Sequence, residues 1–204
     1  MDKYTDILPI SYFGPIEYFI KLHTAHVKIE AHENYQKRSI RNKATILGAN
    51  GIQTLSVPLV KGKTQTQIQS VEISYDESWP EYHIKTLESA YGSSPYMAYY
   101  LDEIRELLFK RVKFLFDLNL SILEYFKKIE LIDNYILSEE YIKHQPPSLN
   151  YRKSSFSWDT YPPSYIYNQV FEDKYGFKSG LSILDLLFNQ GPASRSILLS
   201  LIHI

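Results

Sequence analysis

Cysteine is absent from the 204 residues of this chain. Its absence excludes thiolate catalysis, disulfide bonds and metal sites built on thiolates. Long apolar runs are also missing, since none approaches the roughly 18 residues that a membrane-spanning helix needs. The N-terminus, from Met1 to Asp6, lacks the charged-then-apolar pattern of a secretory signal. We therefore expect a cytoplasmic protein without a membrane span.

An excess of either charge is lacking as well. The chain has 22 Lys and Arg against 23 Asp and Glu, which gives a net charge of −1. Such a balance creates no global field that would attract nucleic acid. We therefore expect a small molecule, and not a nucleic acid, as the partner.

Several motifs with known chemistry are missing too. The sequence has no Walker A loop and no Gly-x-Gly-x-x-Gly cradle, and Ser56 lies outside a Gly-x-Ser-x-Gly elbow. His23, His26 and His32 do not follow a metal-ligand pattern such as HExxH. We therefore expect no metal, no cofactor and no serine hydrolase.

Aromatic residues, by contrast, are abundant, with 18 Tyr and 10 Phe in the chain. Each buried Tyr needs a hydrogen-bond partner for its hydroxyl. Most of these rings belong to the core or its edge in one interpretation, and some grip a sugar or a base in the other. A chain of this length buries roughly 70% of its unfolded surface. We therefore expect a single domain over residues 1–204.

The chain opens with a pattern that predicts a mixed α/β fold. A short apolar run at 7–10, a helical spacing after Pro15 and an alternating run at 27–30 suggest a βαβ unit. Asn50-Gly51 is the strongest short signal for a hairpin. It predicts the end of one strand and the start of the next. The strands expected after the βαβ unit cover residues 44–47, 52–57 and 68–73.

The middle and the C-terminal part are predicted to be helical. The expected helices cover residues 79–91, 96–109, 113–129 and 183–189. Ser94 and Ser182 are candidate N-caps, and Gly191-Pro192 ends the last of these helices. Asp185 is expected to complete a capping box with Ser182 more readily than to serve in catalysis.

Two C-terminal segments have no clear pattern. Residues 145–163 are rich in Pro and Ser and predict a long loop, and residues 165–171 fit either a helix or a strand.

A polar segment between two predicted strands, residues 30–43, is the most informative part of the sequence. If it is extended, alternate residues share a face. A face that combines Lys, Ser and Arg suits phosphate or carboxylate, because Arg offers a planar fork. The alternative is an edge strand that charge protects from pairing. The two expected faces are Tyr35, Lys37, Ser39, Arg41 and Lys43, and Gln36, Arg38, Ile40 and Asn42.

His83 is the candidate general base. It shares one helix face with Trp79 and Leu87, at spacings of i, i+4 and i+8. Imidazole titrates near neutral pH, which suits proton transfer. The alternative is a histidine at the edge of the core with one satisfied hydrogen bond.

Six parts of the chain, in order over nearly its whole length, resemble the WbqC-like protein family in the short form common in Bacteroidetes. The block around Arg38 and Arg41 and the block after Leu181 are the most specific of them. The six parts are residues 15–19, residues 35–43, residues 55–58, Trp79 with His83, Tyr91 with residues 94–96, and residues 181–192.

The resemblance implies a role in the biosynthesis of O-antigen or other surface polysaccharides. A glycine (aminoacyl) or acyl transfer to a sugar is the activity that it suggests. Longer members carry extra sequence between the middle helices and the C-terminal block. In this chain the Pro- and Ser-rich segment 145–163 takes that place.

Two hypotheses of different class follow. In the first, the protein is a transferase in which His83 is the general base. Arg38 and Arg41 hold a phosphate of a nucleotide-linked sugar or the activated amino acid. Ser39 and Asn42 stabilise the oxyanion. In the second, it is a non-catalytic sugar- or nucleotide-sugar-binding or scaffolding protein. Its apolar C-terminus from Ile197 would then dock a partner or a second copy. Further expected substrate-binding residues are Tyr35, Lys37, Trp79 and Tyr91.

Overall fold

The N-terminal βαβ unit is present as predicted. The computed structural model describes residues 5–24, 26–61, 66–143, 146, 149–153 and 167–202. Strand β1 (Asp6–Pro9) and strand β2 (Val27–Glu30) pair in parallel, and helix α1 (Ile16–Leu22) connects them. Pro15 precedes the first turn of α1, where its missing N–H costs no hydrogen bond.

The predicted hairpin is also present. Strand β3 (Lys43–Gly48) and strand β4 (Gly51–Ser56) pair antiparallel, with Gly48 opposite Gly51. Gly51 has a φ of 101°, a conformation that a side chain would strain. In the described part of the chain the strands therefore form two separate pairs, one parallel and one antiparallel.

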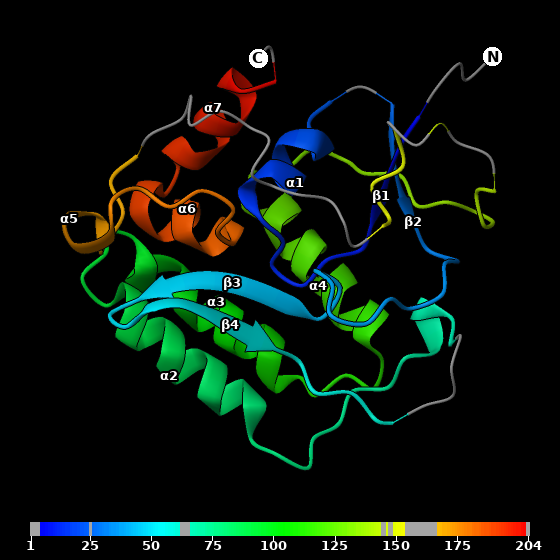
Figure 1. Cartoon of the computed structure of the whole chain (residues 1–204), viewed down its shortest axis with the longest axis horizontal. Coiled ribbons are helices and arrows are strands. Elements are labelled where there is room, and N and C mark those ends of the chain that lie inside the picture. Colours follow the sequence, from blue (N-terminus) through cyan, green and yellow to red (C-terminus); the bar gives the residue numbers. More distant parts are fainter. Residues whose placement is uncertain are drawn as a thin grey trace.

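Helices surround the hairpin on both sides. Helix α2 (Trp79–Tyr91) and helix α6 (Ile183–Gln190) both contact β3, and helix α3 (Met97–Phe109) packs against α2, α6 and α4 (Leu115–Lys128). In Figure 1 the hairpin runs between α2 and α6. The mixed α/β class is thus confirmed, and α2 has the predicted bounds. Of the helices described, none is both long and apolar enough to cross a membrane.

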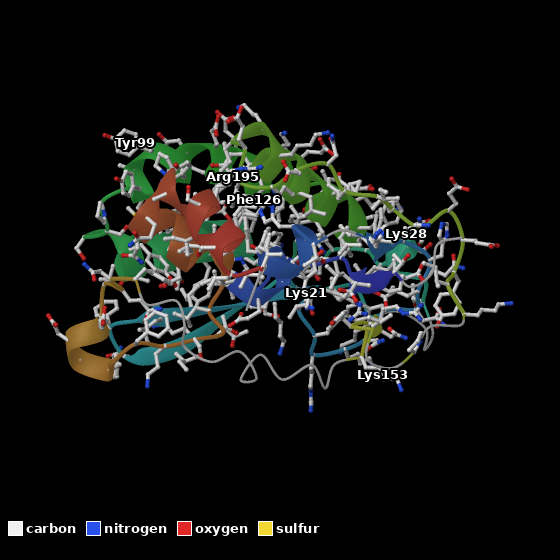
Figure 2. All side chains as sticks on the ribbon, turned by 90° about the horizontal axis from the view of Figure 1, so that it is seen from above. Lys21, Lys28, Tyr99, Phe126, Lys153 and Arg195 are labelled. Carbon is white, nitrogen blue, oxygen red and sulfur yellow. The ribbon has the colours of Figure 1, made fainter. Side chains whose placement is uncertain are left out.

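Aromatic side chains from α1, α4 and the segment before α1 form part of the core. Phe126 of α4 packs its ring edge-on against Phe19 of α1 and against Phe13, at centroid distances of 5.3 and 6.1 Å. Figure 2 shows Phe126 near the centre of the molecule. Seven of the eight residues of α6 are buried, which makes this short helix part of the core.

Three predicted elements are wrong. Residues 68–73 form a 3₁₀ turn, η1 (Ile68–Ser70), and isolated bridges, because the Ile68 amide donates to the Glu33 carbonyl instead of a strand ladder. Ser94 does not cap α3, because its hydroxyl donates to the Tyr91 carbonyl at the end of α2. Residues 167–171 are neither helix nor strand, and a short helix, α5 (Glu172–Tyr175), follows them. Most of segment 145–163 lies outside the described residues.

Ser182 caps helix α6 as predicted. Its hydroxyl accepts a hydrogen bond from the Leu184 amide at 3.3 Å and donates one to the Phe13 carbonyl at 2.7 Å. Asp185 does not complete a capping box, because the Ser182 amide donates to the Thr45 carbonyl instead. The cap therefore fixes the start of α6 to the turn before α1 and to the hairpin.

The C-terminal apolar segment forms one more helix. Helix α7 (Ala193–Ser200) follows the turn at Gly191, whose φ is 51°. Leu198 is fully buried, whereas Ile197 is half-buried and Leu199 is exposed. Most of the apolar character of this segment is therefore explained by packing against the rest of the chain.

We expect Ser182→Ala to lower the free energy of unfolding by about 1–3 kcal/mol, because it removes a cap and leaves a buried carbonyl unpaired. Ser196→Ala, at an exposed position of α7, is the control and should change it by less than about 0.5 kcal/mol. Denaturant unfolding measures both values. Equal stability of the two variants would contradict the role of Ser182.

Candidate functional site

The polar segment between β2 and β3 is not extended. Residues 37–42 form consecutive turns, in which the Ser39 hydroxyl donates to the Gln36 carbonyl at 2.7 Å. Arg38 has a φ of 56°, in the left-handed region that few side chains favour. The expected alternation of faces along 35–43 is therefore wrong, because a turn breaks the period of two.

A buried ion pair organises this loop. The Arg41 guanidinium donates to both oxygens of Glu33, from Nε at 2.7 Å and from Nη2 at 2.5 Å. Arg41 is 1% exposed and Glu33 is 2% exposed. Nη2 also donates to the Arg152 carbonyl at 2.9 Å. The pair therefore connects the loop to a segment more than a hundred residues later in the chain.

A second buried ion pair lies beside the first. Arg152 Nη1 donates to Glu30 Oε2 at 2.9 Å. Glu30, which is fully buried, also accepts hydrogen bonds from Ser138 Oγ at 2.7 Å and from the Ile142 amide at 3.0 Å. Asn150 Oδ1 accepts from Arg152 Nε at 2.9 Å. Each of the two buried carboxylates thus has an arginine partner.

The pKa of Glu33 reflects both its burial and its partners. Burial raises the pKa above the ordinary value for Glu, and the hydrogen bond and charge of Arg41, together with the charge of Arg152, oppose that rise. Desolvation is the largest of these effects. Glu33 therefore depends on Arg41 to remain charged in the interior.

A pocket of about 260 Å³ opens beside the ion pairs. We call it the cation-lined pocket, because five basic side chains line it and none of its described lining residues carries a carboxylate. Four hydroxyl groups also line it. The basic residues are Arg38, Arg41, Lys43, Arg152 and Lys153, and the hydroxyl-bearing residues are Ser39, Thr45, Thr54 and Tyr151.

Three of the five basic side chains are available to a ligand. Arg41 and Arg152 are already paired with buried carboxylates. Arg38, Lys43 and Lys153 form no ion pair with any residue that the structure describes, and Lys153 lies at the surface in Figure 2. The pocket therefore carries uncompensated positive charge, which suits an anion.

Of the residues predicted to form a site, the pocket brings together Arg38, Ser39 and Arg41. Asn42 is buried away from the lining, where its side chain accepts from the Tyr35 hydroxyl at 2.9 Å and donates to the Val57 carbonyl at 3.0 Å. Lys37 is exposed and does not line the pocket.

His83 lies in an aromatic part of the core. Its Nδ1 is 2.8 Å from the Tyr12 hydroxyl, and its ring centroid is 5.1 Å from that of Trp79. The imidazole is 1% exposed, and burial lowers its pKa to about 4, against a smaller opposing effect of the Ser56 backbone. His83 is not among the described residues that line the cation-lined pocket. Its place and its pKa do not suit a general base for a ligand bound there.

Trp79 and Tyr91 are core residues as well. Trp79 is buried against Tyr75 and His83, and Tyr91 packs its ring on Phe188 at 5.2 Å. Neither belongs to the described lining of the cation-lined pocket.

Asp185 belongs to a buried hydrogen-bonded cluster. Its Oδ2 accepts from the Tyr167 hydroxyl at 2.5 Å and from Gln169 Nε2 at 3.0 Å. Burial raises the pKa of this carboxyl, and the hydrogen bonds from Tyr167 and Gln169 oppose the rise. These contacts fix residues 167–169 to α6, which is a structural role.

Arg152 and Lys153, which line the pocket from residues 149–153, were not predicted from the sequence. Two adjacent basic residues after Tyr151 could have indicated an anion site, but the Pro- and Ser-rich composition around them predicted only a loop. Thr45 and Thr54 were also missed, although they face one another in the predicted hairpin. In the described part of the chain, no group of three His, Asp or Glu side chains could hold a metal ion.

Comparison with known proteins identifies one family. The model of the WbqC-like protein family matches residues 11–148, which is more than half of the chain. No curated protein and no solved structure matches the chain.

We expect the buried state of His83 to appear in the pH dependence of stability. Its pKa falls from 6.5 to about 4 on folding, so its contribution is present above pH 6.5 and is lost as pH falls toward 4. His83 alone should lower the free energy of unfolding by about 3 kcal/mol as pH falls over that range. Denaturant unfolding of the wild type and of His83→Gln at several pH values measures the difference. The same pH slope in both proteins would contradict the burial of a neutral imidazole.

We expect Arg41→Met to destabilise the fold by about 3–5 kcal/mol, because it leaves the Glu33 carboxylate buried without a partner. Replacing both residues, as Glu33→Leu with Arg41→Met, should recover part of that loss. The control is Arg105→Met, which breaks an exposed ion pair with Glu88 and should cost less than about 1 kcal/mol. Equal losses for Arg41→Met and Arg105→Met in urea unfolding would show that the buried pair has no special role.

Proposed function

The chain belongs to the WbqC-like protein family, and from this premise we propose that it binds a phosphorylated small molecule in the cation-lined pocket. The class of ligand that fits both the family and the pocket is a sugar phosphate or nucleotide-linked sugar of surface-polysaccharide biosynthesis. The observation that carries the proposal is the lining of five basic side chains without a carboxylate among the described residues.

The charges and donors of the pocket support a phosphate group. A guanidinium such as that of Arg38 binds two phosphate oxygens at once, and the ammonium groups of Lys43 and Lys153 act as point charges. Hydroxyl groups of Thr45 and Thr54 supply further donors at the same wall, whereas the Ser39 hydroxyl already donates to the Gln36 carbonyl. Arg41 and Arg152 are already paired with buried carboxylates. The phosphate would therefore compensate the charges of Arg38, Lys43 and Lys153.

Binding is better supported than transfer. Aminoacyl or acyl transfer to a sugar, which the family resemblance suggests, needs a group that accepts the proton of the sugar hydroxyl or amine. No histidine or carboxylate is among the described residues of the lining, and His83 is buried elsewhere. The cation-lined pocket therefore supports recognition of the anionic part of a ligand, whichever reaction follows.

We expect Lys43→Ala and Arg38→Gly each to weaken the binding of inorganic pyrophosphate and of UDP-glucose by about 10- to 150-fold, since each removes a charged hydrogen bond worth about 1.5–3 kcal/mol. Isothermal titration calorimetry at two salt concentrations measures the affinity, which should fall as salt rises. The control is Lys127→Ala, at an exposed position near the end of α4.

Arg38→Gly tests ligand binding without an expected loss of stability. Glycine adopts a positive φ without the strain of about 1–2 kcal/mol that other residues carry there, so this variant should be at least as stable as the wild type. A wild-type protein that binds neither probe, or variants that bind them as tightly as the wild type, would contradict the proposal.

A further inference from the structure

We infer that a second cavity beside the cation-lined pocket is the subsite for the sugar ring of the same ligand, an inference that rests on the proposed function. This amide-lined cavity has a volume of about 470 Å³. It shares Arg152 and Lys153 with the cation-lined pocket. Its lining consists of His32, Glu33, Asn34, Tyr35, Gln36, Gln67, Tyr141, Asn150, Arg152 and Lys153.

The cation-lined pocket adjoins a second space into which a bound ligand can extend. Cavities that hold a whole small ligand usually measure about 300–1,000 Å³. At about 260 Å³ the cation-lined pocket lies just below this range. The amide-lined cavity, which shares Arg152 and Lys153 with it, adds space beside it.

The lining of the amide-lined cavity suits a polyhydroxylated group. Four amide side chains line it, and three of them offer both a donor and an acceptor, which matches hydroxyl groups that do both; the Asn150 oxygen already accepts from Arg152. Tyr35 and Tyr141 supply ring surface, and none of the described lining residues is aliphatic. Cavities for apolar ligands have the opposite composition. The amides belong to Asn34, Gln36, Gln67 and Asn150.

The acidic residue in this cavity is not available to the ligand. Both carboxylate oxygens of Glu33 accept hydrogen bonds from Arg41, which lines the other pocket. The Glu33–Arg41 pair thus separates the two spaces, with its carboxylate on the sugar side and its guanidinium on the phosphate side. The amide-lined cavity therefore does not select a cationic ligand such as a free amine.

Backbone hydrogen bonds fix the main chain that carries two of the amide side chains, those of Asn34 and Gln67. The Tyr35 amide donates to the Thr66 carbonyl at 2.8 Å, and the Ile68 amide donates to the Glu33 carbonyl at 2.9 Å. These bonds surround a bridge between Asn34 and Gln67. The exposed side chains of Asn34 and Gln67 make no hydrogen bond within the described structure, so they remain available to hydroxyl groups.

The test compares inorganic phosphate with the 1-phosphates of glucose, galactose, mannose and N-acetylglucosamine by isothermal titration calorimetry on the full chain. We expect at least one sugar phosphate to bind about tenfold or more tightly than phosphate. Gln67→Ala and Asn34→Ala should each remove most of that advantage and leave phosphate binding unchanged. The matched control is Gln69→Ala, an exposed glutamine on the 3₁₀ turn that follows Gln67, outside the described cavity lining.

The outcomes separate the two proposals. If neither phosphate nor any sugar phosphate binds, the proposed function fails and this inference fails with it. If phosphate binds and no sugar phosphate binds more tightly, the anion site stands and the sugar subsite is wrong. The subsite is also wrong if Gln67→Ala and Asn34→Ala, with melting temperatures like that of Gln69→Ala, keep the full preference for a sugar phosphate.

Discussion

The hydrogen-bonded ion pair between Arg41 and Glu33 is the interaction on which the candidate site depends. Both side chains are buried, and an arginine in the interior is tolerated only when its charge and its donors are satisfied. Glu33 satisfies the charge with two parallel bonds, and the Arg152 carbonyl accepts a third. The carbonyl of Arg41 in turn accepts from Asn119 of α4 at 2.8 Å, which fixes the loop to the helical part of the fold.

The two buried ion pairs also decide which charges of the cation-lined pocket are left without an acidic partner. Glu33 and Glu30 neutralise Arg41 and Arg152 inside the protein. The basic groups that remain at the wall are those of Arg38, Lys43 and Lys153, which come from a turn, a strand and a distant loop. Because no carboxylate is among the described lining residues of the cation-lined pocket, these three basic groups have no acidic partner there.

Local signals in the sequence were enough to predict most regular elements. Asn50-Gly51, Pro15 and the cap at Ser182 act within a few residues, and the elements they mark are present. The polar segment between β2 and β3 was recognised by composition, but its conformation was not. Its turn at Arg38 is fixed by a buried ion pair, and no periodicity reveals such a contact.

The site itself was predicted only in part, for two physical reasons. Arg41 contacts the Arg152 backbone across 111 residues of sequence, a separation over which local patterns carry no information. His83 was correctly predicted to share an apolar helix face with Trp79, and that face packs into the core. The side chain of His83 is 1% exposed, and burial lowers its pKa.

The most direct test of this account is the crystal structure of the protein with the sugar 1-phosphate that it binds most tightly. The account predicts the phosphate against Arg38, Lys43 and Lys153, with the sugar ring on the far side of the Glu33–Arg41 pair and within hydrogen-bond distance of Gln67. A phosphate bound elsewhere on the molecule, or a structure in which Arg41 has left Glu33 to bind it, would contradict the account.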